Sequence, residues 1–515
     1  MARSSLVRAL RRLYRDFNAA DSDAGPCTKG STRAAFLAGA AAAVTTPPVL
    51  ARTRQLGAVR SPQVVIVGAG VAGLLCAYRL QQAGIASRVY EGNDRIGGRT
   101  WTLRGFFSEG QIAEHGGEFI STNQEAARLL VRELGLDLIN VNHYEPGKDI
   151  YYFNDSIYPI AQAKADYSQV HPTIERTLDE AGYPTTYESY TRAGRALDRT
   201  SVANWIEANV PGGARSKLGQ LLGVSCVQEY GGDTSVQSAL NLLYLFGFDH
   251  RGHLNPDGSN EALHVAGGND QIAARMAAAL PNGSVETGTA LIALRERADG
   301  TYRCTFEAGK RTFDVDADCV CLAIPFTTLR HVDTRNVAFS AVKRLAIDRL
   351  PMGSNAKLHL QFSRRIWNEQ HYDGSSYTQF PYQVSWDVSA AQAGKAGILV
   401  GFPGGREGEL AAPAHGPAPE HLSRAYLAEF EHLYPGISGL WTGAAYLDAW
   451  VNDPWHFGSY AYYGVGDYTS FAGVEGEPEK NVFFCGEQTS YRFQGYINGA
   501  VVSGARAARE IAALS

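Results

Sequence analysis

A strand, a glycine turn and a helix follow one another near the start of this chain and form a nucleotide-binding pattern. The strand Val64–Val67 runs into the complete G-x-G-x-x-G sequence of Gly68–Gly73. A helix with spaced apolar residues continues to Gln82, and a second short strand ends at Tyr90. Glu91 follows at the distance of about 20 residues that the fingerprint requires. The sequence therefore predicts a bound dinucleotide cofactor.

Each glycine of this turn has its own task. Gly68 makes the tight turn, Gly70 lets the backbone approach the pyrophosphate, and Gly73 lets helix and strand pack closely. The pyrophosphate rests on the N-terminal end of the helix. Glu91 is placed to accept hydrogen bonds from a ribose. A chance run of glycines is the alternative, and the strand, the helix and the distal acid together argue against it.

Length and composition agree with a large enzyme of more than one domain. A chain of 515 residues is too long for a single core. A net charge of −5 gives no attraction to nucleic acid, and no apolar run after residue 60 is long enough to span a bilayer. The seven cysteines form no disulfide framework, and C-x-x-C and H-E-x-x-H motifs are missing from the sequence, so no metal site is expected.

The first 60 residues differ from the rest of the chain. Ala34–Val44 is a run of small and apolar residues with Arg33 before it, which is typical of an export signal. Residues 32–37 resemble a twin-arginine signal in which the second arginine has become Ala34. We therefore expect either export to the periplasm or the medium, or a cytoplasmic protein with a disordered, alanine-rich leader. Residues 1–60 are excluded from fold reasoning.

Further glycine-rich blocks lie at both ends of the chain. Asp94–Thr100 carries paired glycines and Arg99, and Gly116–Gly117 is a second pair. Near the C-terminus the apolar strand Val482–Cys485 breaks at a glycine and an acid, and a helix of small residues follows over Val501–Ala513. A cofactor domain is therefore built from both ends of the chain.

These blocks resemble the flavin-containing amine oxidase family, which includes monoamine, polyamine and L-amino-acid oxidases. The resemblance runs from about residue 62 to 515. It rests on the glycine fingerprint, Asp94–Thr100, Gly116–Gly117, Pro351–Lys357 and Trp450–Ala508. The last block is the most specific, because its residues match the monoamine oxidase pattern at its spacing: Trp450, Pro454, Gly458, Ser459, Tyr460, Gly486, Glu487, Gly495 and Tyr496.

The resemblance implies an α/β fold with a Rossmann-like FAD-binding domain assembled from discontinuous segments, beside an α+β substrate domain. The FAD-binding domain is expected over 62–140, 262–345 and 452–515. The substrate domain is expected over 141–261 and 346–451. Within the latter we predict helices at Ser201–Asn209 and Ser235–Leu245, and a surface loop at Gly401–Pro419.

FAD is the implied cofactor, with its adenine end at the fingerprint and its flavin ring at the C-terminal block. The residues expected to contact it are Gly68, Gly70, Gly73, Glu91, Arg99, Gly117, Glu118, Val285, Trp450, Gly486, Glu487 and Ile497. Some relatives attach the flavin through a cysteine where this chain has Ser459. A serine cannot form that thioether, so we predict non-covalent FAD.

Three residues carry the implied catalysis. Tyr460 and Tyr496 match the two aromatic rings that flank the substrate amine, although the chain has 26 tyrosines and either could be a core residue. Lys357 matches the lysine that holds a water against the flavin. The alternation of Asn355–Phe362 by itself favours a solvent-facing lysine. The implied reaction oxidises an amine to an imine, which water converts to a carbonyl product and ammonia, while oxygen becomes hydrogen peroxide.

The substrate class is the point left open. Amino-acid oxidases of the family place an arginine after the glycine pair, and this chain has Glu118 and Phe119 there. That favours a plain amine or polyamine, with Phe119 near the substrate. Arg492 is either a carboxylate clamp for an L-amino acid or a surface charge. A flavin desaturase or protoporphyrinogen-type oxidase, a dehydrogenase with another acceptor, and a binding flavoprotein without turnover stay open, as does a homodimer.

Overall fold

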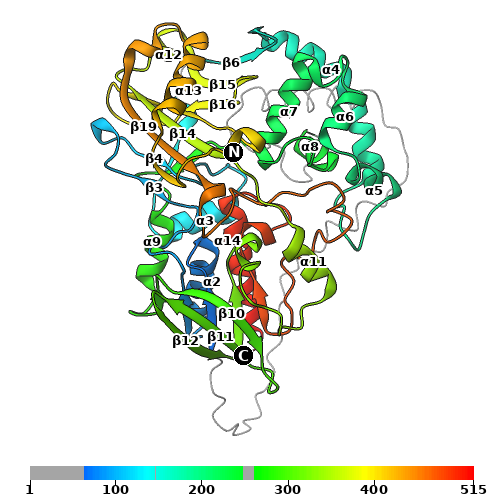
Figure 1. Ribbon diagram of the computed structural model, residues 1–515, viewed down its shortest axis with the longest axis vertical. Helices are drawn as coiled ribbons and strands as arrows, with labels where there is room; N and C mark the ends of the chain where they lie inside the picture. The colour runs from blue at the N-terminus through cyan, green and yellow to red at the C-terminus, as the bar shows by residue number, and fades with distance from the viewer. Residues whose placement is uncertain (1–62, 145–146, 247–259, 515) are drawn as a thin grey trace, which may run out of the picture.

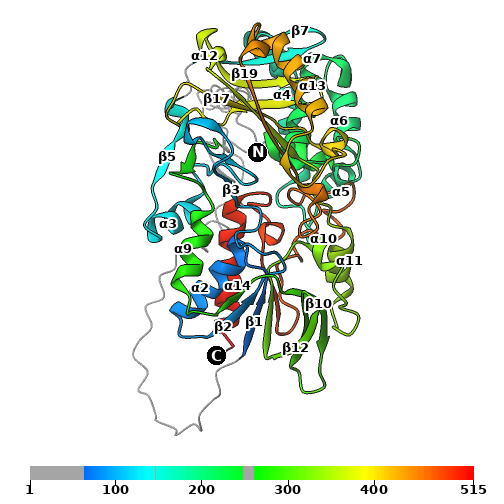
Figure 2. The same ribbon diagram turned by 60° about the vertical axis from the view of Figure 1, so that its left-hand side comes forward.

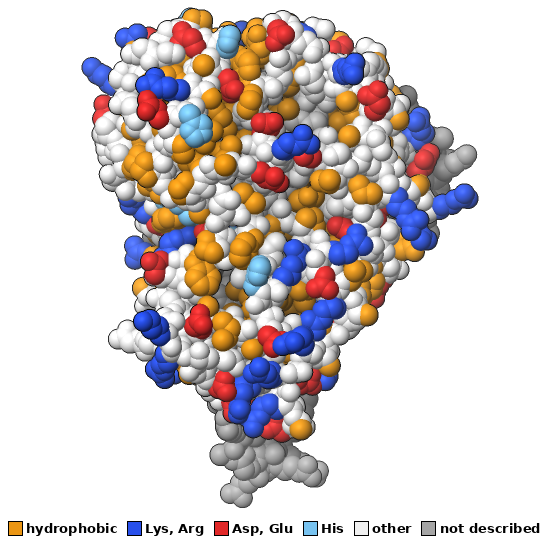
Figure 3. Space-filling view, in the orientation of Figure 1, with side chains coloured by type: hydrophobic (Ala, Val, Ile, Leu, Met, Phe, Trp, Pro, Cys, Tyr) orange, Lys and Arg blue, Asp and Glu red, His pale blue; other side chains and the backbone are white. Residues whose placement is uncertain are grey.

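The computed structural model describes residues 63–144, 147–246 and 260–514, so the leader predicted over 1–60 lies outside the described residues. The described chain forms a lower half built on a parallel sheet and an upper half that combines a second sheet with a group of helices (Figure 1). Within these residues no helix combines the length and apolar character that a membrane crossing needs. Basic and acidic side chains are interspersed over the face in Figure 3.

The lower half contains a five-stranded sheet whose neighbouring strands are all parallel, in the order β20-β13-β1-β2-β9. Its strands come from all three segments expected to form the cofactor domain. The central strand is apolar throughout and buried along its whole length, as parallel strands covered on both faces are. The strands are β1 (Val64–Val67), β2 (Ser87–Tyr90), β9 (Val285–Glu286), β13 (Cys319–Leu322) and β20 (Val482–Phe484).

Two long helices pack closely beside this sheet and join the two ends of the chain. They are α2 (Val71–Gln82) and α14 (Ile497–Ala512). A methyl group on Gly504 would lie 2.4 Å from the carbonyl oxygen of Ala72, so only glycine permits this approach. Helix α14 begins four residues before its predicted start, because the extended Tyr496 caps it and the residues that follow continue the helix.

Smaller elements complete the lower half. A three-stranded antiparallel sheet, seen beside β1 in Figure 2, consists of β10 (Ala290–Glu296), β11 (Tyr302–Ala308) and β12 (Arg311–Ala317). The remaining elements are β3 (Thr102–Leu103), β4 (Ala113–Glu114), β5 (Leu138–Asn140), β8 (Leu263–Val265), α3 (Glu125–Glu133), α9 (Gln271–Ala279), α10 (Phe326–Leu329) and α11 (Ala341–Arg349).

The upper half has a mixed eight-stranded sheet in the order β18-β19-β14-β17-β16-β15-β6-β7. Its strands are β6 (Lys148–Phe153), β7 (Ser156–Ile157), β14 (Ala356–Phe362), β15 (Tyr372–Thr378), β16 (Val384–Asp387), β17 (Gly397–Gly401), β18 (His415–Pro417) and β19 (Trp441–Ala449). The helices are α4 (Ile160–Ala181), α5 (Arg192–Asp198), α6 (Val202–Asn209), α7 (Lys217–Tyr230), α8 (Ala239–Phe246), α12 (Ile366–Glu369) and α13 (Glu420–Leu433).

Strand β14 is buried on both faces, which corrects the solvent-facing position that alternation favours for Lys357. One face carries Leu358, Leu360 and Phe362, which join an apolar core with residues of α12 and α13. The other face carries Lys357, His359 and Gln361 and is covered by the segment that contains residues 108–118. Alternation identified two faces, but it could not show that both are covered.

The predicted surface loop Gly401–Pro419 is only partly a surface loop. Gly401–Gly405 is buried, because the N–H of Ala356 donates to Pro403 and the N–H of Gly405 donates to Gly231. The later residues 415–417 form β18 and pair with β19 at the sheet edge. The helices predicted over Ser201–Asn209 and Ser235–Leu245 occur as α6 and α8, and each begins later than predicted.

Candidate active site

One cavity of about 1490 Å³, a volume that includes the space at its mouth, runs from the glycine turn to the C-terminal block. Its lining joins the residues predicted for the adenine end of a dinucleotide to those predicted for the flavin end. The sequence-predicted residues that line it are Gly68, Gly70, Glu91, Arg99, Gly117, Glu118, Phe119, Lys357, Trp450, Tyr460, Gly486, Glu487, Tyr496 and Ile497.

The glycine turn leaves space beside the backbone at the start of α2. Gly68 has φ +104°, a backbone conformation that L side chains rarely adopt. A methyl group on Gly73 would lie 2.0 Å from the carbonyl oxygen of Gly68, whereas one on Gly70 would meet nothing within 4 Å. The backbone at Gly70 is therefore exposed to the cavity, where a phosphate approaching the helix N-terminus would lie.

The carboxylate of Glu91 is built into this turn. One oxygen accepts the N–H of Ala69 at 2.6 Å, and the other accepts the N–H of Asn93 at 2.8 Å. Burial raises the pKa of Glu91 even though these two donors act against it. Glu91 thus fixes the turn while lining the cavity.

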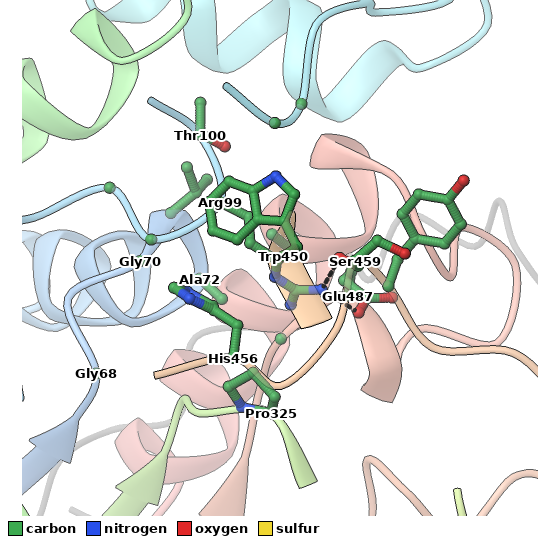
Figure 4. Close-up of a pocket in the computed structure, with 18 of the residues that line it drawn as sticks. Gly68, Gly70, Ala72, Arg99, Thr100, Pro325, Trp450, His456, Ser459 and Glu487 are labelled. Carbon is green, nitrogen blue, oxygen red and sulfur yellow. Dashed lines mark hydrogen bonds and ion pairs between the residues drawn. The ribbon is translucent and has the colours of Figure 1, made fainter. Parts of the chain in front are cut away.

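At the other end, an ion pair ties three distant segments together. Nη1 of Arg99 donates to Oε1 of Glu487 at 2.8 Å and to the carbonyl of Ser459 at 2.7 Å (Figure 4). The second oxygen of Glu487 accepts the N–H of Gly495 at 2.6 Å. The charge of Arg99 is therefore compensated by a protein carboxylate.

Lys357 projects from β14 toward three oxygen atoms that accept hydrogen bonds from its Nζ. Its Nζ lies 3.0 Å from the carbonyl of Glu114, 2.9 Å from that of Gly116 and 2.8 Å from Oε2 of Glu118. Three acceptors match the three hydrogens of an ammonium, so a water held by Nζ must replace one of them. Burial acts to raise the pKa of Glu118, but the Lys357 ammonium and the Trp386 N–H outweigh it and lower that pKa.

The two tyrosines reach the cavity from different segments, and helix α7 holds both hydroxyl groups. The hydroxyl of Tyr460 donates to the carbonyl of Gln228 at 2.6 Å, and that of Tyr496 donates to the carboxylate of Glu229 at 2.7 Å. A methyl group on Gly495 would lie 3.6 Å from the ring of Tyr460, so the residue before Tyr496 packs on that ring. The hydroxyl groups of the two rings are thus anchored at adjacent residues of α7.

Three predicted residues lie away from the cavity lining, and one of them, Gly73, packs against Gly68 instead. Arg492 is exposed, with its guanidinium 5.9 Å from the ring centre of Phe493. This position favours the surface charge over the carboxylate clamp. Val285 lies on β9, beside Val89 of β2 at the edge of the parallel sheet. Its contact with an adenine stays a prediction.

Sequence reasoning missed a chain of histidines and aspartates beside the cavity. Oδ1 of Asp448 lies 2.7 Å from Nδ1 of both His115 and His415, and His415 continues through its Nε2 to Asp453 at 2.9 Å. Asp453 in turn contacts Nδ1 of His456 at 3.0 Å. The spacing of Asp453 and His456 was the one local signal, since the other contacts join distant segments.

Three members of this hydrogen-bonded series are of residue types that bind metals. Ligand atoms of His115, His415 and Asp448 lie within 4.8 Å of one another. In the structure Nδ1 of each imidazole is hydrogen-bonded to the same carboxylate oxygen, Oδ1 of Asp448. Hydrogen bonds account for the contacts at Oδ1 of Asp448, whereas its Oδ2 is buried and has no hydrogen-bond partner among the described residues.

The lining fits a bound dinucleotide in two further respects. Oε1 of Gln488, which lines the cavity, is buried and has no hydrogen-bond partner among the described residues. A buried polar atom of this kind needs a partner that a ligand or a water supplies. The second is the open space beside the backbone of Gly70 at the start of α2.

A family model, described as flavin containing amine oxidoreductase, matches residues 71–512. Among curated proteins, the chain is 26% identical to amine oxidase [flavin-containing] A of Sus scrofa, over 87% of this chain and 84% of that protein. It is 27% identical to the putative flavin-containing monoamine oxidase AofH of Mycobacterium tuberculosis, over 88% and 96% of the two chains.

Solved structures show the same fold. Cyclohexylamine oxidase from Brevibacterium oxydans superposes with a TM-score of 0.74 at 22% identity, covering 88% of this chain and 99% of that one. Putrescine oxidase, in a structure with bound putrescine, gives the same TM-score, identity and coverage. At this identity the likeness concerns the fold alone.

Proposed function

The chain belongs to the flavin-containing amine oxidoreductase family, and on that premise we propose that it is an FAD-dependent oxidase of amines that carry no carboxylate. It would remove two electrons and two protons from the C–N bond of a primary or secondary amine and give an imine. Water would hydrolyse the imine to a carbonyl product and ammonia or a smaller amine. Oxygen would take up the two electrons and two protons and become hydrogen peroxide.

The balance of charge in the cavity carries the proposal on substrate class. Arg99 and Lys357 are the Lys and Arg side chains among its described lining residues, and each is paired with a carboxylate. Arg492 lies on the surface. Glu261 adds a further acid to the lining and is 3% exposed. A substrate carboxylate would meet no uncompensated cation here, whereas an ammonium would meet acidic neighbours.

The chain's own residues would bind and orient the amine. The rings of Tyr460 and Tyr496 would attract its partial positive charge, by about 0.5–2 kcal/mol, and their anchored hydroxyl groups keep the rings in place. Lys357 and Glu118 supply a buried proton donor and acceptor pair next to the cavity. Bound FAD supplies the two-electron acceptor, so the protein's part is orientation and exclusion of water.

Matched substrate pairs test the proposal. Phenethylamine and phenylalanine differ by one carboxylate, and so do putrescine and ornithine. Peroxide release with the amine of each pair and a much weaker signal with its amino acid would support the proposal. A signal confined to the amino acids would overturn it in favour of an L-amino-acid oxidase.

The same assay separates the remaining alternatives. Reduction of an artificial dye with amines, but no peroxide, would identify a dehydrogenase. No turnover of any amine or amino acid would return attention to a desaturase, a protoporphyrinogen-type oxidase or a binding flavoprotein.

Export through residues 1–60 is a further proposal that the leader sequence supports, and a homodimer stays open. Mass determination of the mature N-terminus in the source cell tests the first. Light scattering of the purified holoenzyme tests the second.

A further inference from the structure

His456 lies in the turn that follows Trp450 and is held firmly on one side. Its Nδ1 lies 3.0 Å from Oδ1 of Asp453, and its ring meets the ring of Trp450 edge-on, with centres 5.0 Å apart. The backbone is fixed as well, because the hydroxyl of Thr327 donates to the carbonyl of His456 at 2.7 Å. The other ring nitrogen, Nε2, is left to face a different neighbour.

That neighbour is the space above the glycine turn. A methyl group on Gly98 would lie 3.7 Å from Nε2 of His456 and 3.4 Å from the Cα of Gly70. The same space borders the start of α2, and His456 lines the cavity there. Figure 4 shows the His456 side chain reaching from its backbone toward Gly70 and Ala72. Nε2 therefore lies where a phosphate on the helix N-terminus would come within reach.

We propose that His456 is a ligand of the FAD diphosphate, with Nε2–H donating to a phosphate oxygen while Asp453 holds the ring from the opposite side. The geometry is that of an imidazole oriented by a carboxylate, which fixes which nitrogen faces the ligand. The inference depends on the flavin cofactor of the family and is independent of the substrate.

The charges around His456 make this contact dependent on pH. Asp453, with His415 on its other oxygen, favours a charged ring, while Arg95 and Arg99 disfavour it. Glu487 compensates Arg99, and Glu91 lines the same cavity. Without the cofactor, burial dominates and lowers the pKa of His456 to about 4.

A diphosphate beside Nε2 reverses this balance. Its negative charges favour the imidazolium and raise the pKa of His456, so FAD binding takes up one proton from solution. Affinity for FAD should therefore be greatest at mildly acidic pH. It should fall as pH rises through the pKa of His456 in the complex.

The test measures FAD release from the purified holoenzyme by the fluorescence of free FAD, between pH 5.5 and 8.5. His456→Asn keeps a donor for Asp453 but removes Nε2. His456→Gln places a neutral donor near the position of Nε2. His421→Gln, an exposed histidine on α13, is the matched control.

We expect His456→Asn to weaken FAD binding about 10- to 100-fold at pH 6 and to abolish its pH dependence. His456→Gln should recover part of the affinity without the pH dependence, and the control should match the wild type. The phosphorus-31 shift of bound FAD should titrate in the wild type and stay constant in both His456 variants. An unchanged pH profile in folded His456→Asn, or a phosphorus signal that titrates equally in all variants, would overturn the proposal.

Discussion

Nζ of Lys357 lies 2.8 Å from Oε2 of Glu118, and the two side chains are 4% and 7% exposed. The pair joins β14 of the upper sheet to the segment that follows the second glycine pair of the cofactor half. Breaking a buried pair by removing one member costs more than removing both, because a lone charge is then left in a poor solvent.

Lys357→Met leaves the Glu118 carboxylate with the Trp386 N–H as its one side-chain donor shown in the structure. We expect a loss of about 3–5 kcal/mol in the free energy of unfolding and a strong loss of amine-dependent flavin reduction. The double variant Lys357→Met/Glu118→Gln should recover stability but not reduction. Urea unfolding and stopped-flow absorbance measure the two effects. A single variant as stable as the wild type would show that the pair does not form in solution.

The glycines of the turn should separate cofactor binding from folding. Gly70→Ala places its methyl group in open space at φ −70°, so the fold should keep its Tm while FAD affinity falls. Gly73→Ala places a methyl group 2.0 Å from a carbonyl oxygen and should cost about 1–3 kcal/mol or more of stability. Circular dichroism melting and FAD content per chain distinguish the two. Equal melting loss in both variants would argue against this division.

Ser459 should leave the flavin free to dissociate. Its hydroxyl donates to Oδ1 of Asn355 at 2.8 Å and offers no nucleophile comparable to a thiolate. Acid precipitation of the holoenzyme should therefore release the yellow chromophore into the supernatant. Colour that stays with the washed protein pellet would contradict non-covalent binding.

The two tyrosines should differ in how much their hydroxyl groups matter. Tyr496→Phe removes a hydrogen bond to the carboxylate of Glu229, and Tyr460→Phe removes one to a carbonyl. Since bonds to charged groups are stronger, we expect a loss in kcat/KM of about tenfold or more for Tyr496→Phe and about fivefold for Tyr460→Phe. Steady-state peroxide assays measure both. Full turnover in the double variant would sink the two-ring account of substrate binding.

Neighbouring glutamates of α13 should change stability with pH in opposite directions. Burial raises the pKa of Glu429 to about 7, so the stability that its protonated form confers is complete below pH 4.5 and is lost as pH rises through 7. At pH 8, Glu429→Gln should therefore exceed the wild type in free energy of unfolding by about 1–2 kcal/mol and melt at a higher temperature. At pH 4.5 the two proteins should differ little.

Glu431 is the matched control from the same helix. Hydrogen bonds from Ser438 and Gly436 lower its pKa, so its stabilisation is present above its ordinary pKa and is lost as pH falls. Glu431→Gln should melt lower than the wild type at pH 8. Melting shifts of the same sign in both variants would contradict the assignment.

The local parts of the site followed directly from the sequence. The turn at Gly68–Gly73 depends on backbone angles and on the close approach of a strand to its own helix, and both are set within a few residues. Strand β1 was predicted at its observed bounds, and β2 with its observed end, for the same reason. The resemblance supplied the residues of the flavin end, which motif spacing could identify without a structure.

Long-range partners could not be predicted in this way. His456 shows a local aspartate, but nothing in its surroundings along the chain places Nε2 opposite Gly98. Arg492 lies four residues from Tyr496 and still faces solvent, because the chain turns between them. Proximity along the chain therefore left the position of Arg492 open and did not point to Nε2 of His456.

The sequence by itself determined the glycine turn at the start of a helix, since turn geometry and helix direction are local properties. The packing of the upper sheet against the cofactor half decided the rest: that the polar face of β14 is buried, that Lys357 meets Glu118, and that Arg99 is neutralised by Glu487. Charges hundreds of residues apart take their partners from the docking of whole elements, because burial makes an unpaired charge too costly to keep.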